Sequence, residues 1–197
     1  KLGTDVISGE TDIGGAIADA DLFLLDDGAG GTLRKTAASR IATYIGAGTN
    51  TPAFMAYLSS AQSISDATWT KIQFDTEVLD TDNAYDNSSN YRFTPQTAGK
   101  YLVNCYTVPN TGTNTDILRH YQSIYKNGSQ AQLYNLDTRD GGGFRVPGIS
   151  SSYIINMNGS SDYIEIFVYA DSNSGNNANI AGGSDEHSFF SAHKIIE

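Results

Sequence analysis

The chain has little of what marks several common classes of protein. A single cysteine, Cys105, cannot form a disulfide within the chain, so a small disulfide-stapled secreted domain is excluded. No apolar run approaches the roughly 20 residues that a transmembrane helix needs. Lys and Arg number only 12 against 22 Asp and Glu, and the net charge of -10 argues against binding to nucleic acid or to an anionic membrane.

The abundant residues indicate a β-rich globular protein. Charged residues make up only 17% of the 197 positions, while 12 Tyr and 8 Phe are too many for a disordered acidic chain. Many Gly, Ser, Thr and Asn residues accompany these aromatics, which is typical of strands and turns with a polar, largely uncharged surface. The length fits one all-β domain with a short appendage.

A breaker-rich segment, 46–52, divides the chain into two regions. We expect residues 1–51 to form a small N-terminal segment for attachment or for a shaft, and residues 52–197 to form the main domain. In the first region, Leu22–Leu25 and Leu33–Thr36 predict a hairpin whose turn contains Asp-Gly and Gly-Gly pairs.

A short helix is predicted to follow the hairpin over Ala37–Ile45, where apolar residues recur at helical spacing and Thr36 is placed as the N-cap. A hairpin and so short a helix cannot bury enough apolar surface to be stable alone. We therefore expect this segment to pack against another copy of itself or against a partner.

The second region is a succession of predicted strands. Alternation of apolar and polar residues predicts strands at 70–74, 101–106 and 163–169. Further short strands fit between turn clusters at Ala53–Leu58, Tyr91–Phe93, Tyr121–Tyr125, Gln132–Leu136, Tyr153–Met157 and Phe189–Ile195. About ten such strands predict an all-β sandwich or jelly roll.

The strand at 163–169 is aromatic on the face that should meet water. One of its faces is already apolar, and the other carries Tyr163, Phe167 and Tyr169. A monomeric sandwich normally leaves its outer face polar. These aromatic residues are therefore either scattered decoration of a neutral surface or part of a subunit interface.

The stretch Tyr85–Val103 resembles the signature of the C1q-like globular head domain, with an aromatic-Asp/Asn turn, a Phe followed by Pro, and a Gly-x-Tyr leading into an apolar strand. The resemblance extends over 52–196, and the other parts follow in the family's order. They are the opening strand at Ala53–Ala56, the next at Trp69–Phe74, the Lys-Asn-Gly hairpin at Ile124–Gly128, the penultimate strand at Asp162–Ile166 and the closing strand at Ser188–Ala192, where Ala192 replaces the usual Gly.

This resemblance implies a ten-stranded jelly roll that assembles as a compact homotrimer. It implies binding rather than catalysis, with ligands on the apex loops or on the sides between subunits. It also implies that outward-facing aromatic residues line the threefold axis. The residues expected at this trimer interface are Phe54, Tyr57, Tyr163, Phe167, Tyr169 and Phe190.

The N-terminal region has a resemblance of its own. Asp21–Asp27, followed by Gly-Gly-Thr-Leu-Arg-Lys, resembles an element frequent in tail-fibre and structural proteins of tailed bacteriophages, marine phages especially. Together with a trimeric head it implies a fibre tip or virion appendage that residues 1–51 join to other virion proteins. Assembly in a reducing bacterial cytoplasm would agree with the lack of disulfides.

No catalytic or cofactor site is expected. His120, His187 and His193 lack the spacing of metal ligands, and the triad residue types in 184–187 are adjacent in sequence, which does not make a triad. The glycine run 140–143 lacks the strand and helix of a phosphate loop.

One acidic cluster carries the oxygen ligands that Ca²⁺ prefers, but we favour a solvated acidic loop over a calcium site. The cluster consists of Asp75, Glu77, Asp80, Asp82 and Asp86.

Four residues beside the glycine run are candidates for a receptor loop: Tyr134, Asp137, Arg139 and Asp140. Aromatic rings and planar polar groups suit recognition of a sugar by stacking and hydrogen bonding. The alternative is an ordinary surface loop with one buried tyrosine.

Three functions remain open at this point. The favoured one is a fibre tip that binds a host-surface glycan or outer-membrane component through three copies of one site. The second is a capsid decoration or head-fibre protein with a structural role. The third, a depolymerase or other enzyme, is the least favoured, because nothing in the spacing of the acidic residues selects a catalytic pair.

Overall fold

The computed structural model describes residues 14–26, 33–44, 51–112, 116–183 and 187–195. The chain divides into two compact units, Lys1–Thr49 and Asn50–Glu197. Within the described ranges, no helix is both long enough and apolar enough to cross a membrane.

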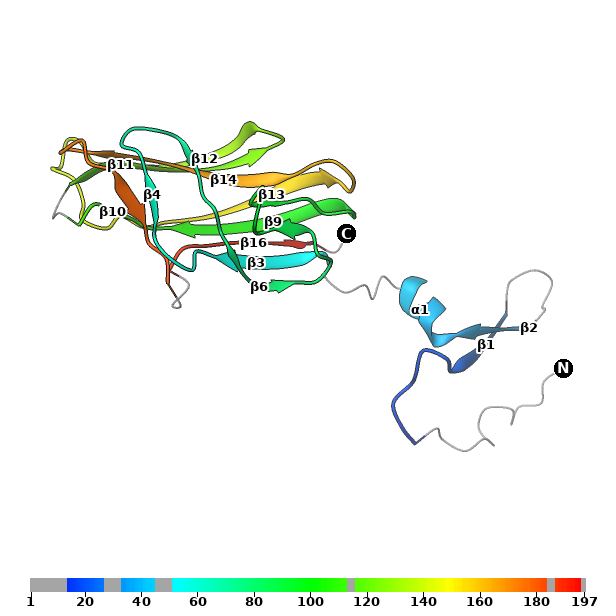
Figure 1. The fold of residues 1–197 in the computed structure, drawn as a ribbon. Helices are drawn as coiled ribbons and strands as arrows, with labels where there is room; N and C mark the ends of the chain where they lie inside the picture. The colour runs from blue at the N-terminus through cyan, green and yellow to red at the C-terminus, as the bar shows by residue number, and fades with distance from the viewer. Residues whose placement is uncertain (1–13, 27–32, 45–50, 113–115, 184–186, 196–197) are drawn as a thin grey trace. The chain divides into compact units, whose positions relative to one another are not determined.

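The N-terminal unit contains an antiparallel hairpin of β1 (Leu22–Asp26) and β2 (Leu33–Ala37), followed by α1 (Ala38–Tyr44) (Figure 1). The predicted hairpin turn and the predicted last helical residue, Ile45, lie outside the described residues. The hairpin pairing places Leu22 opposite Ala37.

The predicted N-cap is wrong, because Thr36 pairs with Phe23 inside the hairpin. The first N–H groups of α1 are satisfied by backbone instead. The amides of Ala38 and Ser39 donate to the carbonyls of Asp21 and Asp19, at 2.8 and 3.3 Å. The segment before the hairpin therefore folds back and completes the start of the helix.

The apolar side chains of the N-terminal unit are not covered. Leu22, Phe23, Leu24 and Leu25 are 60%, 37%, 57% and 39% exposed. Helix α1 has no buried residue. The described part of this unit thus has apolar side chains but no core of its own.

The C-terminal unit is built on two large sheets (Figure 1). The five-stranded sheet has the order β13-β9-β16-β3-β6. Its strands are β3 (Ala53–Tyr57), β6 (Thr76–Asp80), β9 (Ala98–Thr107), β13 (Ile149–Asn158) and β16 (Phe189–Lys194).

The six-stranded sheet has the order β12-β11-β14-β8-β7, with β5 paired to β14. Its strands are β5 (Thr70–Lys71), β7 (Tyr85–Asp86), β8 (Arg92–Phe93), β11 (Ile117–Lys126), β12 (Ser129–Asp137) and β14 (Ile164–Ser172). A small third sheet contains β4 (Gln62–Ile64), β10 (Pro109–Asn110) and β15 (Ala178–Ile180).

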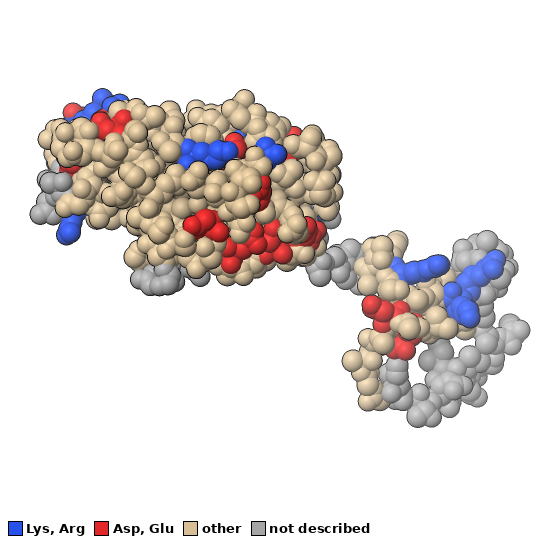
Figure 2. All heavy atoms as spheres, in the orientation of Figure 1, with Lys and Arg blue, Asp and Glu red and all other residues tan. Residues whose placement is uncertain are grey.

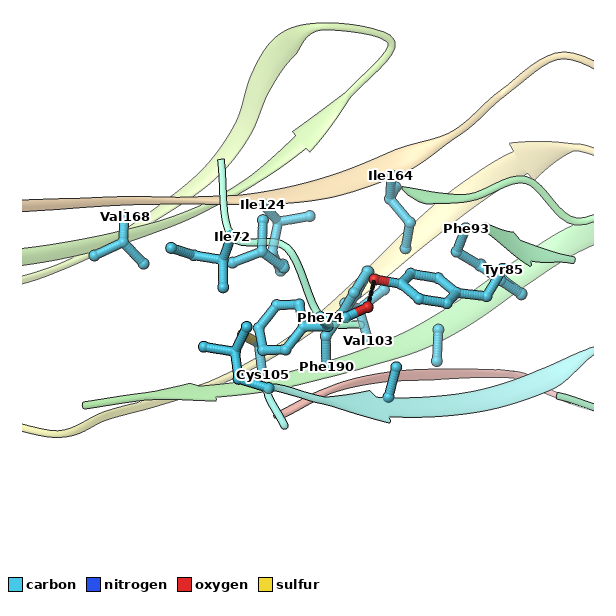
Figure 3. Close-up of a cluster of buried hydrophobic side chains, with 14 of the residues drawn as sticks. Ile72, Phe74, Tyr85, Phe93, Val103, Cys105, Ile124, Ile164, Val168 and Phe190 are labelled. Carbon is cyan, nitrogen blue, oxygen red and sulfur yellow. Dashed lines mark hydrogen bonds between the residues drawn. The ribbon is translucent and has the colours of Figure 1, made fainter. Parts of the chain in front are cut away.

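The core lies between the two large sheets, where their inner faces meet (Figure 3). Alternate residues of β9, among them Val103 and Cys105, face alternate residues of β14 such as Ile164 and Val168. The prediction of an all-β sandwich is confirmed. The period-two patterns predicted it because each strand buries one face.

The segment predicted as a strand at 70–74 forms a strand only at Thr70 and Lys71, although the Ile72 amide still donates to the Ile166 carbonyl of β14 at 2.9 Å. Ile72 and Phe74 still point into the core and are fully buried. Tyr85 donates a hydrogen bond from its hydroxyl to the Phe74 carbonyl at 3.0 Å, which holds this segment in place (Figure 3).

Candidate functional site

The predicted interface residues Phe54 and Phe190 are in the core, 2% and 0% exposed. The Phe54 ring stacks on Tyr85 at 4.6 Å and on Phe93 at 4.4 Å, and meets the edge of Phe190 at 4.8 Å. Their assignment to a trimer interface is wrong, because the inward face of β3 and β16 is the one that carries them.

The other four predicted interface residues do not share a surface. Tyr57 lies on the outer face of the five-stranded sheet, where it pairs with Phe189. Tyr163 immediately precedes β14, and Phe167 and Tyr169 lie within it. All three alternate with buried residues of the strand, so they lie on the outer face of the six-stranded sheet. The two groups therefore lie on opposite outer faces of the sandwich.

The outer face of the five-stranded sheet carries two apolar rows, with the polar residues Ser191, Asn104 and Ser152 paired between them. Strand pairing aligns Tyr57, Phe189 and Tyr106 in one row across β3, β16 and β9. A second row aligns Leu102 of β9 with Ile154 of β13, which is 54% exposed. We call these five residues the β9 face.

An open hollow of about 610 Å³ adjoins the β9 face. Its lining is mainly apolar and includes Tyr106, Val108, Val146, Phe189 and His187. Val146 is 47% exposed. A face of this composition is the kind that subunit interfaces cover.

The outer face of the six-stranded sheet carries a different group, which we call the aromatic row: Trp69, Tyr121, Tyr125, Phe167 and Tyr169. The Trp69 ring lies 5.7 Å from that of Tyr169, and 6.4 Å from those of Tyr121 and Tyr125. Tyr121 and Tyr169 are cross-strand partners with rings 5.4 Å apart and nearly parallel. Tyr125 and Phe167 contact each other at 4.3 Å.

Of the receptor-loop candidates, Tyr134 is misassigned. It lies inside β12 and packs against the core, and its hydroxyl donates to the Ser152 carbonyl of β13 at 2.7 Å. Burial raises the pKa of this phenol. Tyr134 therefore joins the two sheets at the edge of the sandwich and does not present its ring to a ligand.

The other three candidates, Asp137, Arg139 and Asp140, come together around a hollow of about 730 Å³. Its lining is completed by Thr138, Gly141, Gly143 and Phe144, and the Phe144 side chain is 49% exposed. We call this feature the loop hollow. It combines an exposed ring with charged and backbone polar groups, as sites for small polar ligands do.

Arg139 and Asp137 form the fixed part of the loop hollow. The Arg139 Nε lies 2.9 Å from Asp137 Oδ1, and its Nη2 lies 2.6 Å from Oδ2. This two-point contact lowers the pKa of Asp137 to about 2, so the carboxylate is charged at all ordinary pH values. The pair is exposed and adds little to stability.

The loop hollow and the aromatic row meet. Asp137 of β12 lies opposite Arg119 of β11 in the strand register. The Tyr121 hydroxyl lies 3.4 Å from Asp137 Oδ2. Arg119 in turn lies over the Tyr169 ring at 5.3 Å and forms an ion pair with Asp171. One surface therefore runs from the aromatic row into the loop hollow.

A buried polar network, missed from the sequence, supports this end of the sandwich. His120 is fully buried, with Nδ1 2.7 Å from the Pro147 carbonyl oxygen and Nε2 3.1 Å from Thr107 Oγ1. Thr107 contacts the side-chain amide of Gln122 at 2.6 Å, and Gln122 contacts Ser151. The sequence does contain a signal for this network, because the alternation of β11 places the polar residues His120 and Gln122 at inward positions.

The acidic cluster does not converge on a cation. Asp75 accepts hydrogen bonds from Ser59, and Asp80 accepts one from the Tyr85 amide at 2.8 Å. Asp86 accepts from the amides of Ser88, Ser89 and Asn90, which strongly lowers its pKa. Figure 2 shows acidic side chains gathered near the β6 edge.

Groups of three or more potential metal ligands are absent from the described part of the chain. Of the residues considered for a catalytic triad, His187 is exposed beside the β9 face, and 184–186 lie outside the described residues. Cys105 is buried, which raises the pKa of its thiol and makes it a poor nucleophile.

No protein-family model matches the sequence, and no curated protein matches it. Solved structures do match. They include Eiger TNF from S. frugiperda, with a TM-score of 0.54 and 8% identity, murine APRIL, with 0.51 and 14%, and the globular domain of zebrafish complement 1qA, with 0.50 and 10%. Each match covers 73% of this chain, and the covered shares of those chains are 91%, 99% and 97%. The chain thus has the jelly-roll fold of TNF-like and C1q-like heads.

Proposed function

We propose that this chain is a homotrimeric binding head of a bacteriophage appendage, the receptor-binding tip of a tail fibre, which attaches the virion to the host cell surface. The observation that carries the proposal is the β9 face. Its aromatic and aliphatic rows would remain in contact with water in a monomer, whereas a trimer built on this face would bury them.

The N-terminal unit supports the attachment role. Its strand β1 exposes apolar side chains on both faces, and α1 buries none. A two-stranded hairpin without a core is marginal in water, so the segment needs a partner to fold stably. We propose that residues 1–51 join the head to other virion proteins, as the resemblance of Asp21–Asp27 to a phage element implies.

The loop hollow supports the binding role. It is an open, polar and partly aromatic surface, suited to a host glycan or an outer-membrane component. A trimer presents three copies of it on one rigid head, so weak individual contacts combine into firm attachment. This function requires neither a catalytic residue nor a cofactor.

Adsorption to cells tests the proposal. The purified, fluorescently labelled chain is titrated onto a panel of marine bacterial strains, alongside Arg139→Ala in the loop hollow and Arg40→Ala, an exposed arginine of the N-terminal unit. We expect saturable adsorption to at least one strain, weakened roughly tenfold by Arg139→Ala and unchanged by Arg40→Ala.

A capsid decoration protein would share the trimer and the N-terminal docking but would need no receptor. Absence of saturable adsorption on every strain would therefore overturn the receptor-binding role and favour decoration.

A further inference from the structure

The aromatic row is a surface feature that neither the core nor the β9 face accounts for. Its β11 and β14 members alternate with inward residues such as Ile124, Ile164 and Val168, which point into the core (Figure 3). The sole tryptophan of the chain, Trp69, comes from the segment before β5 and lies against these strands. Four strand residues and one loop residue thus bring five rings to one outer face.

The rings of the row are held in place by one another. Tyr121 and Tyr169 lie with their rings 18° from parallel, and Trp69 is 5.7 to 6.4 Å from three tyrosine rings. Strands β11 and β14 pair without interruption from Arg119 to Lys126, which fixes the spacing of these side chains. A rigid set of rings loses little conformational entropy when a ligand stacks on it.

The row also offers polar groups. Tyr125 and Tyr169 bring hydroxyl groups to the row, and each hydroxyl can donate and accept a hydrogen bond. Trp69 is 36% exposed. A ligand on this face therefore meets apolar ring faces with hydroxyl groups between them.

Charged groups flank the row in pairs that cancel. Lys71 bonds to Glu165 beside Phe167, and Arg119 bonds to Asp171 beside Tyr169. Along the row two cations therefore balance two anions, and the loop hollow adds Arg139 against Asp137 and Asp140. The slight negative excess disfavours an anionic ligand. A guanidinium has five N–H donors, so Arg119 retains donors for hydroxyl groups while it pairs with Asp171.

The row has the length to hold a chain-like ligand. Tyr125 and Arg119 are six residues apart on β11, which corresponds to about 20 Å along the strand. The loop hollow begins beyond Arg119, at Asp137. A ligand of several repeated units can therefore lie along the row and end in the hollow.

We infer that the aromatic row and the loop hollow form one extended site for a neutral oligosaccharide. The pyranose units stack their C–H faces on the rings, and their hydroxyls bond to the tyrosine hydroxyls, the flanking ion pairs and Arg139. A neutral sugar chain fits because the face combines ring surfaces with uncharged and mutually neutralised polar groups. The inference rests on the proposed function only for the source of the sugar, the host surface.

The single tryptophan provides the test. Fluorescence of the full chain on excitation of Trp69 is titrated with three neutral probes, maltohexaose, cellohexaose and hexa-N-acetylchitohexaose. Tyr121→Ala removes a ring of the row, and Tyr44→Ala removes a tyrosine that is 91% exposed on α1 and outside the site. Tyr121→Phe keeps the ring and removes only the hydroxyl near Asp137.

We expect at least one probe to change the Trp69 fluorescence with saturation in the millimolar range or below. Tyr121→Ala should weaken this binding about tenfold or more, Tyr121→Phe should weaken it less, and Tyr44→Ala should leave it unchanged. No response to any probe, or equal binding by Tyr121→Ala, would overturn the inference.

The solution mass of Tyr121→Ala separates the remaining outcomes. If that variant loses the assembly of the parent chain, the row is covered by a second copy and the oligosaccharide site is refuted. If the parent chain is trimeric and adsorbs to cells but binds no probe, the extended site fails while the proposed function stands.

Discussion

At the scale of single residues, His120 couples the sandwich to pH. Burial lowers its pKa from 6.5 to about 4, against an opposing hydrogen bond to the Pro147 carbonyl. The folded chain therefore holds this ring neutral, whereas the unfolded chain protonates it below its ordinary pKa. Stability is complete above pH 6.5 and falls as the pH drops toward 4, because the unfolded state then binds more protons.

We expect the buried, neutral His120 to lower the free energy of unfolding by about 3 kcal/mol as the pH falls from 6.5 to 4. Urea unfolding at several pH values in this window measures the slope. The glutamine in His120→Gln cannot titrate, so the free energy of unfolding of this variant should depend less on pH in this window. Its stability at neutral pH will be lower than that of the parent chain. Parallel slopes for the parent and the variant would contradict a neutral, buried His120.

At the scale of elements, the turn between β13 and β14 depends on a glycine that packs on β9. Gly159 has φ of 71°, and a Cβ added there would lie 2.2 Å from the Ala98 amide nitrogen. Gly175 has φ of 69° and no atom within 4 Å of such a Cβ. The two positions share the left-handed backbone but differ in the close approach.

Gly159→Ala should therefore destabilise the chain by about 3 kcal/mol, since it adds a backbone clash to the left-handed strain. Gly175→Ala carries the strain alone and should cost about 1 kcal/mol. Chemical denaturation at neutral pH measures both. Equal losses would show that the turn does not press on the start of β9.

The sequence predicts where most strands lie but not which of their faces is buried. Alternation located the strands, because each buries one face, and it predicted the sandwich. It did not assign the faces of β3, where Phe54 and Ala56 alternate with Met55 and Tyr57 and both sets are apolar. Which set faces inward depends on the pairing register with β16, and that register is a tertiary property.

The sequence predicts only those parts of the candidate site whose residues are neighbours along the chain. Asp137, Arg139 and Asp140 are close in sequence beside a glycine run, so the loop itself brings them together. The aromatic row joins residues from positions 69 to 169, which only the pairing of β11 and β14 and the return of the chain before β5 make neighbours. Tyr134 was misassigned because its place at the sheet edge depends on β13.

At the scale of the whole molecule, the two outer faces of the sandwich differ in kind. The β9 face consists of an aromatic row and an aliphatic row with a polar row between them, and it lies beside a mainly apolar hollow. The opposite face has rings that contact one another and charges that cancel in pairs. The first suits permanent burial between subunits, and the second suits a ligand that comes and goes.

Light scattering on the purified protein measures the mass of the chain in solution and so shows whether it assembles on the β9 face. We expect a mass three times 21.1 kDa. Ile154→Lys, which places a charge on the β9 face, should reduce it to 21.1 kDa, while Leu133→Lys, at a 40% exposed leucine of β12 on the opposite face, should leave it tripled. A parent chain that is monomeric would contradict a head assembled on the β9 face.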